Sequence, residues 1–240
     1  LGPVRGLSNL TIRSGALVDR VELRSARAVG VRLASPEQTI GADLVILAAG
    51  AYASPALLMR SGIGPAAELS ALGIPCQVDL PAVGRNLADH PWAPVPLAVT
   101  VDTDGPGFQA VLTWHSADAD TSGPPDLQIF AQGPFNNDGR SVASLCAALL
   151  KPHSRGRVTL RSPDPAAPPV IDLGLLTVER DVQRLIEGLR HARRLLAMPD
   201  FVAIADNLAR SGAAGEQDLN DYVWANVRTY HHPTGTCAMG

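Results

Sequence analysis

The chain has 240 residues, of which 46% are hydrophobic and 18% are charged, a balance typical of a globular protein and not of a disordered one. Its net charge of −3 leaves no basic surface to neutralise phosphates, so we expect no nucleic-acid partner. The sequence contains no run of about 18 apolar residues, so we expect no membrane span.

The three cysteines, Cys76, Cys146 and Cys237, are far apart and odd in number. Their spacing predicts neither a disulfide framework nor a metal site. We therefore expect a reducing, cytoplasmic setting. The first residues, Leu1 to Arg5, contain no initiator Met and no signal-peptide pattern, so they resemble the middle of a protein.

Short alternating segments open the chain and predict a small antiparallel meander, with strands at 10–13, 17–23, 28–33 and 38–40. Residues 43–50 differ because they form a continuous apolar run that ends on Gly50. Such a run predicts a strand buried on both faces of a parallel sheet. Two helices should follow. The first begins at Pro55 after an N-cap at Ser54 and ends near Gly62, and the second covers 66–72.

The Pro- and Gly-rich segment 81–96 predicts a long loop, with a domain boundary near Trp92. Apolar periodicity predicts helices over 181–197, ending before Pro199, and over 216–228. An antiparallel sheet is predicted from strands at 96–101, 110–115, 126–131, 142–150 and 157–161. The fold class is therefore α/β (α+β), divided at 1–92, 93–225 and 226–240.

Two segments carry residues suited to chemistry. The small residues Ala48, Ala49 and Gly50 would let a flat cofactor approach the backbone closely, although a tight turn without a ligand has the same pattern. Near the end of the chain, His231 and His232 lie beside a proline and a Gly-flanked turn. Either is a candidate acid or base, and a structural histidine that hydrogen-bonds within the turn is the alternative.

Four segments, in order along the chain, resemble motifs of the glucose-methanol-choline (GMC) family of FAD-dependent alcohol oxidoreductases. Residues 50–64 resemble its longer signature, and 83–91 (Val-Gly-Arg-Asn-Leu-Ala-Asp-His-Pro) resemble its VGxNLxDH segment. Residues 151–158 with 171–172 resemble its P-x-SRG-x-V … ID region. Residues 230–240 resemble its YHPxGTCxMG loop. The likeness is to the choline dehydrogenase-like branch of the family.

The resemblance implies a partial FAD-binding Rossmann-like domain over 1–92 and a substrate-binding domain with an antiparallel sheet over 93–225. Residues 226–240 would then return to the FAD domain with the catalytic histidine loop. The reaction it implies is oxidation of a small-molecule alcohol to an aldehyde or ketone, with a base taking the hydroxyl proton and hydride passing to the flavin.

By the same resemblance, His232 is the base, and His231 falls at a variable position of the motif and is assigned to substrate binding. His90 is a further substrate-binding candidate. The cofactor-binding candidates are Val18, Ala49, Gly50 and Asn86, with the backbone of Val18 against the adenine. Bland alternatives stay open, since Val18 could simply face the core and Asn86 and His90 could bond loop backbone. Cys237 is expected to be a packing residue, and His115, His153 and His191 are expected to be structural or surface residues.

Parts of the family pattern are missing from the sequence. No G-x-G-x-x-G follows a predicted strand, so we expect this chain to be an internal or C-terminal-side part of a longer enzyme. We further expect the 240 residues alone to bind FAD weakly or not at all. Two alternatives to alcohol oxidation remain, namely an FAD protein that resembles hydroxynitrile lyases and a non-catalytic remnant. The sequence does not predict the alcohol, the electron acceptor, the second active-site residue or the oligomeric state.

Overall fold

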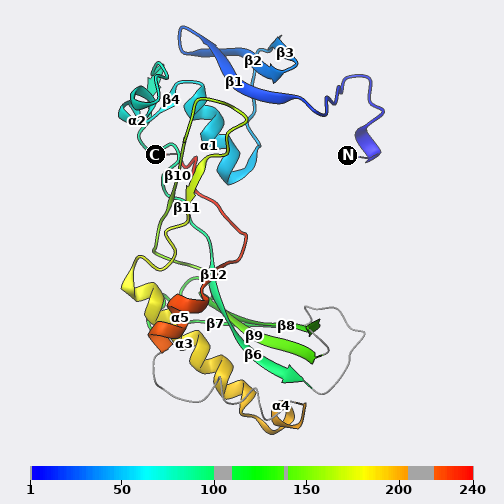
Figure 1. The fold of residues 1–240 in the computed structure, drawn as a ribbon, viewed down its shortest axis with the longest axis vertical. Coiled ribbons are helices and arrows are strands. Elements are labelled where there is room, and N and C mark those ends of the chain that lie inside the picture. Colours follow the sequence, from blue (N-terminus) through cyan, green and yellow to red (C-terminus); the bar gives the residue numbers. More distant parts are fainter. Residues whose placement is uncertain (1, 100–109, 138–139, 205–218, 240) are drawn as a thin grey trace. The chain divides into compact units, whose positions relative to one another are not determined.

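The computed structural model describes residues 2–99, 110–137, 140–204 and 219–239 (Figure 1). It divides into two compact units. The first gathers Leu1–Leu87, Gly156–Asp172 and Thr234–Gly240, and the second gathers Ala88–Arg155 and Leu173–Pro233. Helices and strands are mixed in the described chain and the largest sheet is antiparallel, which confirms the predicted fold class.

An antiparallel meander follows a short 3₁₀ turn, η1 (Gly2–Val4), in the first unit. Its strands pair in the order β1 (Leu17–Arg24), β2 (Arg27–Ser35) and β3 (Glu37–Gly41), which confirms three of the four predicted strands. The prediction of a strand at 10–13 is wrong. Its apolar residues Leu10 and Ile12 are exposed, and an alternating pattern forms a strand only where a neighbour supplies hydrogen bonds.

Helix α1 (Gly50–Arg60) starts at Gly50, so the prediction that it begins at Pro55 with Ser54 as its N-cap is wrong. Pro55 instead lies inside the helix, where its missing N–H leaves the carbonyl of Ala51 without its helical donor. The hydroxyl of Thr236 donates to that carbonyl oxygen at 2.6 Å. A contact from the far end of the sequence therefore completes the helix.

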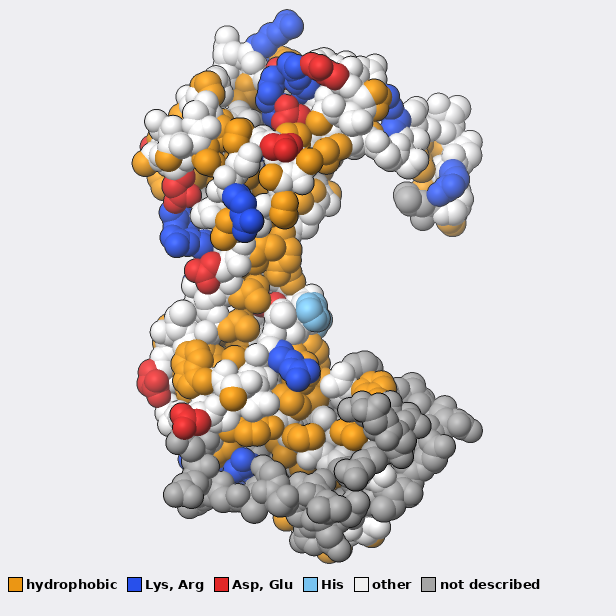
Figure 2. Space-filling view, viewed as in Figure 1, with side chains coloured by type: hydrophobic (Ala, Val, Ile, Leu, Met, Phe, Trp, Pro, Cys, Tyr) orange, Lys and Arg blue, Asp and Glu red, His pale blue; other side chains and the backbone are white. Residues whose placement is uncertain are grey.

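Residues 42–49 form no strand in the described chain, which corrects the prediction of a buried strand over 43–50. Leu44 is 74% exposed and Ile46 is 78% exposed. Hydrophobic side chains accordingly reach the surface of the first unit in Figure 2. The apolar run has the composition of a buried strand, but none of the described strands pairs with it, and a strand needs such a partner.

The rest of the first unit consists of short elements. Strands β4 (Ile63–Gly64) and β5 (Val78–Asp79) pair in parallel with each other. Between them in the sequence lies α2 (Ala66–Ala71), the second predicted helix. Strands β10 (Arg157–Thr159) and β11 (Val170–Asp172) pair antiparallel. The small core of this unit contains Met59, Leu69, Ile74 and Val83.

A five-stranded antiparallel sheet lies in the second unit and confirms four of the five strands of the predicted sheet. Its order is β12-β6-β9-β8-β7, where β6 is Pro91–Val99, β7 is Val111–Trp114, β8 is Leu127–Asn137, β9 is Arg140–Leu149 and β12 is Arg228–Thr229. The prediction that 157–161 belongs to this sheet is wrong, because β10 pairs only with β11, in the first unit, within the described chain. Residues 100–101 of the predicted strand 96–101 lie outside the described residues.

Strand β6 begins inside the loop predicted over 81–96, so that prediction is wrong for its last residues. Strand β12 pairs with β6 at Pro91 and Trp92 alone, whereas β9 pairs with β6 from Trp92 to Val99. Pro94 and Pro96 thus lie where β6 has one described neighbour, and a strand edge tolerates their missing N–H groups.

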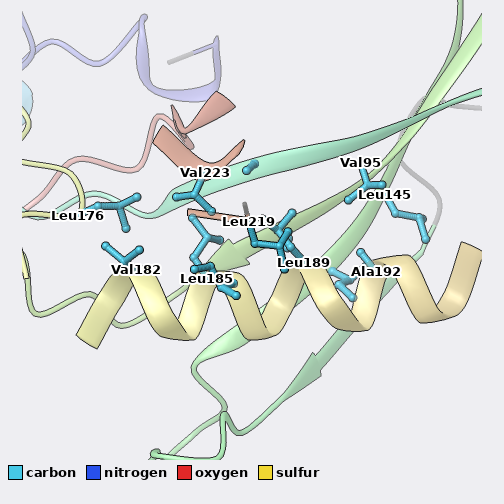
Figure 3. Packing of buried hydrophobic residues seen from close by; sticks show 13 residues of the cluster. Val95, Leu145, Leu176, Val182, Leu185, Leu189, Ala192, Leu219 and Val223 are labelled. Carbon is cyan, nitrogen blue, oxygen red and sulfur yellow. The ribbon is translucent and has the colours of Figure 1, made fainter. Parts of the chain in front are cut away.

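Helix α3 (Glu179–Leu196) packs on the sheet and confirms the helix predicted over 181–197. Its inward residues Val182, Leu185, Leu189 and Ala192 meet Val95 and Leu145 of the strands and Val223 of α5 (Figure 3). Helices α4 (Pro199–Ile204) and α5 (Leu219–Asn226) follow, and residues 216–218 of the helix predicted over 216–228 lie outside the described residues. No helix in the described chain is long and apolar enough to cross a membrane.

A buried ion cluster also joins α3 to the sheet. The guanidinium of Arg184 donates to Asp126 through Nε at 2.9 Å and lies 3.4 Å from Asp181. Burial alone would raise the pKa of Asp126, but hydrogen bonds from Ser116 and Arg184 lower it overall. Because all three charged side chains are buried, their pairing fixes how the helix lies on the strands.

Candidate functional site

The first unit contains a cavity of about 590 Å³ beside β1 and α1. Val18, from β1, and Ala49, just before α1, both line it, so the structure brings these two candidates together. Arg60 is the one charged side chain among its described lining residues, and its Nε donates to the carbonyl of Asp19 at 2.9 Å. A mostly apolar wall with a single polar group suits a flat organic ligand.

The start of α1 leaves its backbone approachable next to this cavity. Ala49 and Gly50 are exposed, and Gly50 has a φ of +79° with nothing within 4 Å of where a Cβ would lie. No side chain caps the helix, although Ala49 N donates to Ser54 Oγ at 3.0 Å. The first-turn N–H groups can therefore face a ligand that carries partial negative charge, so the residues present fit a large planar cofactor with polar groups.

Asn86 lies elsewhere in the first unit, beside the terminal loop. It has a φ of +59°, and its Nδ2 donates to the carbonyl of Gly235 at 3.5 Å. A Cβ at Gly235 would come within 2.3 Å of the Asn86 carbonyl oxygen, so only glycine permits this approach. Asn86 does not line the cavity that Val18 and Ala49 share. This contact agrees with its interpretation as a loop residue that bonds backbone, and its cofactor role stays a prediction.

The second unit brings His90 and His232 together. Tyr230 N donates to the carbonyl of His90 at 3.1 Å, and this bond extends the pairing of β12 with β6. The two imidazole centroids are 5.4 Å apart, with their planes at 89°. The ring of His232 stacks on Tyr230 at 4.7 Å, and Tyr230 stacks in turn on Phe130 at 4.9 Å. Segments far apart in the sequence thus form one aromatic cluster.

The two imidazoles differ in exposure. Burial lowers the pKa of His90, the neighbouring His232 lowers it further, and Asp89 opposes both. Nδ1 of His90 is buried and has no hydrogen-bond partner within the described chain. His232 is exposed, while its backbone N donates to Asp89 Oδ1 at 3.0 Å. The cluster therefore presents an accessible imidazole, on a fixed backbone, that can accept a proton from a bound molecule.

His231 is also exposed, and it has a left-handed φ of +61° that is uncommon for any residue except glycine. Its N–H donates to Thr229 Oγ1 at 3.0 Å. The sequence analysis missed the stacking of Tyr230 and the buried carboxylate of Asp89. The signal for Asp89 was present, because this residue directly precedes His90 in the VGxNLxDH segment.

Among the described residues, the cysteines and the acidic side chains supply no second centre. Within the ranges that the structure describes, no group of three or more His, Cys, Asp and Glu side chains could hold a metal ion. Cys76 and Cys237 are exposed, Cys146 is buried, and none of these three is in a disulfide. Burial raises the pKa of Cys146 to about 12, so its thiol is unreactive near neutral pH.

Comparisons with known proteins identify the protein family that contains these residues. Models of the GMC oxidoreductase family match residues 1–92 and 152–240. An oxygen-dependent choline dehydrogenase from Chromohalobacter salexigens is 31% identical over 268 residues, which cover 97% of this chain and 48% of the relative. The chain spans about half the length of the curated relatives that it matches.

Solved structures agree with this match. The structure of pyridoxine 4-oxidase from Mesorbium loti superposes with a TM-score of 0.82 at 30% identity, and the match covers 100% of this chain and 50% of that one. A formate oxidase structure from Aspergillus oryzae RIB40, which concerns FAD modification, gives a TM-score of 0.85 at 25% identity over 97% of this chain and 52% of that one. These comparisons confirm the predicted resemblance, the fold class and FAD as the expected cofactor.

Proposed function

The chain belongs to the GMC oxidoreductase family, and we propose that it supplies part of an FAD-dependent enzyme that oxidises a small-molecule alcohol to an aldehyde or ketone. His232 accepts the hydroxyl proton in this proposal. The observation that carries it is the exposed imidazole of His232, whose ring stacks on Tyr230 and whose backbone is bonded to Asp89. A neutral imidazole is a suitable base near physiological pH.

In this proposal the cavity of the first unit holds FAD, which supplies the hydride acceptor. Val18 and Ala49 form part of the wall, and the absence of a side chain at Gly50 keeps the adjoining backbone accessible. These three roles are supported by the shared location of the residues. The role of Asn86 is supported by its motif alone.

The second unit provides the substrate surface in the same proposal. His90, whose pKa is lowered by burial, stays neutral and can orient a polar substrate group beside His232. His231, which is exposed, is a second candidate for substrate binding. The predicted division at 1–92, 93–225 and 226–240 follows these roles, while the compact units also group residues 156–172 with the first unit. A cytoplasmic location and the lack of a nucleic-acid partner stay predictions from composition.

The proposal is tested on the FAD-loaded enzyme that contains this chain and its flanking sequence. The enzyme is mixed anaerobically with a panel of alcohols, and flavin absorbance is followed. The panel includes choline and pyridoxine, the alcohols after which a choline dehydrogenase and a pyridoxine 4-oxidase among the similar proteins are named. We expect bleaching by at least one alcohol, and we expect His232→Ala to slow it by about 10² to 10⁴-fold. His153→Ala, which removes another exposed imidazole, is the matched control and should leave the rate unchanged.

Each other outcome has a defined meaning. A parent enzyme that no alcohol bleaches would overturn alcohol oxidation and favour a lyase or a non-catalytic protein, because a lyase leaves its flavin oxidised. Bleaching that proceeds equally fast in His232→Ala would keep the reaction but remove His232 as its base.

A further inference from the structure

Asp89 is a carboxylate in an unusual position, because it is only 3% exposed although it directly precedes His90 and accepts the backbone N–H of His232. A buried charge is unfavourable unless hydrogen bonds compensate for the water that it loses. The bonds that Asp89 accepts therefore show what the structure uses this residue for.

Both carboxylate oxygens of Asp89 accept hydrogen bonds, from donors in two segments, the start of β6 and residues 229–232. Oδ1 accepts from the N–H of His90 at 2.7 Å and from the N–H of His232 at 3.0 Å. Oδ2 accepts from the hydroxyl of Thr229. One side chain thus joins the start of β6 to the loop that follows β12, and hydrogen bonds to a charged acceptor are stronger than neutral ones.

The same bonds also stabilise the strained residue of the loop. The hydroxyl of Thr229, which donates to Asp89, accepts the N–H of His231 at 3.0 Å. His231 has its left-handed φ of +61° at this point, directly before His232. Such a backbone conformation persists in a residue other than glycine only when surrounding contacts hold it.

We propose that Asp89 is a positioning residue, which fixes the backbone of His231 and His232 so that the imidazole of His232 is aligned before substrate binds. Asp89 acts through the His232 loop and not on the substrate. The proposal rests on the proposed function, because alignment matters only if His232 is the base. A base misplaced by about 1 Å can slow a reaction by about 10²-fold, which sets the size of the expected effect.

Three variants of the FAD-loaded, full-length enzyme test this role. Asp89→Ala removes all three bonds, whereas Asp89→Asn keeps one oxygen that can accept both N–H groups but loses the charge. Thr229→Val removes only the hydroxyl that links Asp89 to His231. The control is Asp181→Asn, because Asp181 is also buried and accepts the backbone N–H groups of His153 and Ser154. This variant also removes the charge that lies 3.4 Å from Arg184, so it controls for the loss of a buried carboxylate outside the His232 loop.

Two readouts separate positioning from general stability. The first compares two quantities in each variant, the limiting rate of flavin reduction and the apparent dissociation constant of the alcohol. We expect Asp89→Ala to lower the rate by about 10²-fold with little change in the dissociation constant, and Asp89→Asn and Thr229→Val to lower it less. The second is hydrogen–deuterium exchange of the backbone amides of residues 229–232. Exchange should be faster than in the parent in Asp89→Asn, faster still in Asp89→Ala, and parental in Asp181→Asn.

The outcomes also distinguish this inference from the proposed function. If Asp89→Asn and Thr229→Val leave both the reduction rate and the exchange of residues 229–232 at parental values, the inference is overturned even where His232→Ala is slow. If exchange accelerates but reduction is parental in all variants and in His232→Ala, then the role of His232 as the base fails instead, while alcohol oxidation itself is not overturned. Should Asp89→Ala not fold, Asp89→Asn and Thr229→Val decide.

Discussion

At the scale of one residue, His90 shows how neighbours determine a protonation state. Its ring centroid lies 5.4 Å from that of His232 and 6.2 Å from that of Tyr230, and its Nδ1 is buried. Burial disfavours the charged imidazolium, and a second imidazole close by adds to this effect. The adjacent carboxylate of Asp89 favours the charged form and opposes this lowering of the pKa only in part.

A pH dependence of stability follows from this environment. The pKa of His90 in the folded chain is below the unfolded value of about 6.5, so the unfolded state takes up the proton first as the pH falls. The free energy of unfolding should therefore be independent of His90 above that value and decrease as the pH falls from there toward the lowered folded pKa. We expect the melting temperature of His90→Gln to fall less than that of the parent between about pH 8 and pH 5.

The exposed His153 supplies the control for this measurement, since His153→Gln should keep the parental dependence on pH. Identical curves for the parent and His90→Gln would show that the proton uptake of another group dominates. The direct check is an NMR titration of the His90 imidazole, whose midpoint should lie below the ordinary histidine value.

At the scale of elements, α1 depends on a residue that is distant in sequence. The hydroxyl of Thr236, which is 2% exposed, donates to the Ala51 carbonyl that Pro55 cannot serve. Thr236→Val keeps the shape of the side chain but leaves this carbonyl without a donor. We expect a loss of about 1–3 kcal/mol in the free energy of unfolding, measured by denaturant titration of the enzyme that contains this chain.

Thr236→Ser keeps the hydroxyl and should retain most of the stability. A Thr236→Val variant as stable as the parent would mean that water or another donor serves the Ala51 carbonyl. The backbone bond from Gly84 N to the Thr236 carbonyl, at 2.9 Å, is present in both variants and does not contribute to the difference.

The spacing of apolar residues predicted those elements that bury one face against the rest of the fold. Helix α3 is an example, because Val182, Leu185 and Leu189 recur at helical spacing and meet the sheet. The start of α1 and the strand expected over 43–50 were not predictable in this way. The first depends on Thr236, and the second requires a neighbouring strand, so in both cases a distant segment decides the local structure.

The candidate site shows the same division between motif and geometry. The motifs indicated His90 and His232, and the structure brings these two residues together. The hydrogen bonds that Asp89 accepts from the His232 loop were not predicted. They form only when β12 pairs with β6 and brings Thr229 next to Asp89. The VGxNLxDH segment draws attention to Asp89, but it does not show whether that carboxylate is buried and hydrogen-bonded or exposed in a loop.

At the scale of the whole molecule, both units are assembled from separated segments of the chain. In the first unit, Gly84 accepts a hydrogen bond from Val158 N at 2.7 Å and donates one to the Thr236 carbonyl at 2.9 Å. A Cβ at Gly84 would lie 2.3 Å from the Val158 carbonyl oxygen, so three segments meet where only glycine fits. The first unit is therefore complete only when the segment around Thr236 is in place.

The surface of the first unit leads to the last prediction, that the 240 residues on their own bind FAD weakly or not at all. The wall of the cavity includes Val45 and Ile46, which belong to the unpaired segment 42–49, and Ile46 is 78% exposed. A cofactor seated there would be covered on one side only, and ligand sites usually enclose most of the ligand surface. The chain also offers no G-x-G-x-x-G loop to hold a pyrophosphate.

The measurement is a fluorescence titration of FAD with the purified chain, beside the same titration with the longer enzyme that contains it. We expect saturation only for the longer enzyme, together with a yellow, flavin-loaded product on purification. A chain of 240 residues that purifies as a stable yellow monomer would contradict this prediction. It would mean that the wall formed by Val18, Ala49 and the exposed apolar segment suffices for FAD, and that the remaining half of the family fold serves the reaction more than the binding of its cofactor.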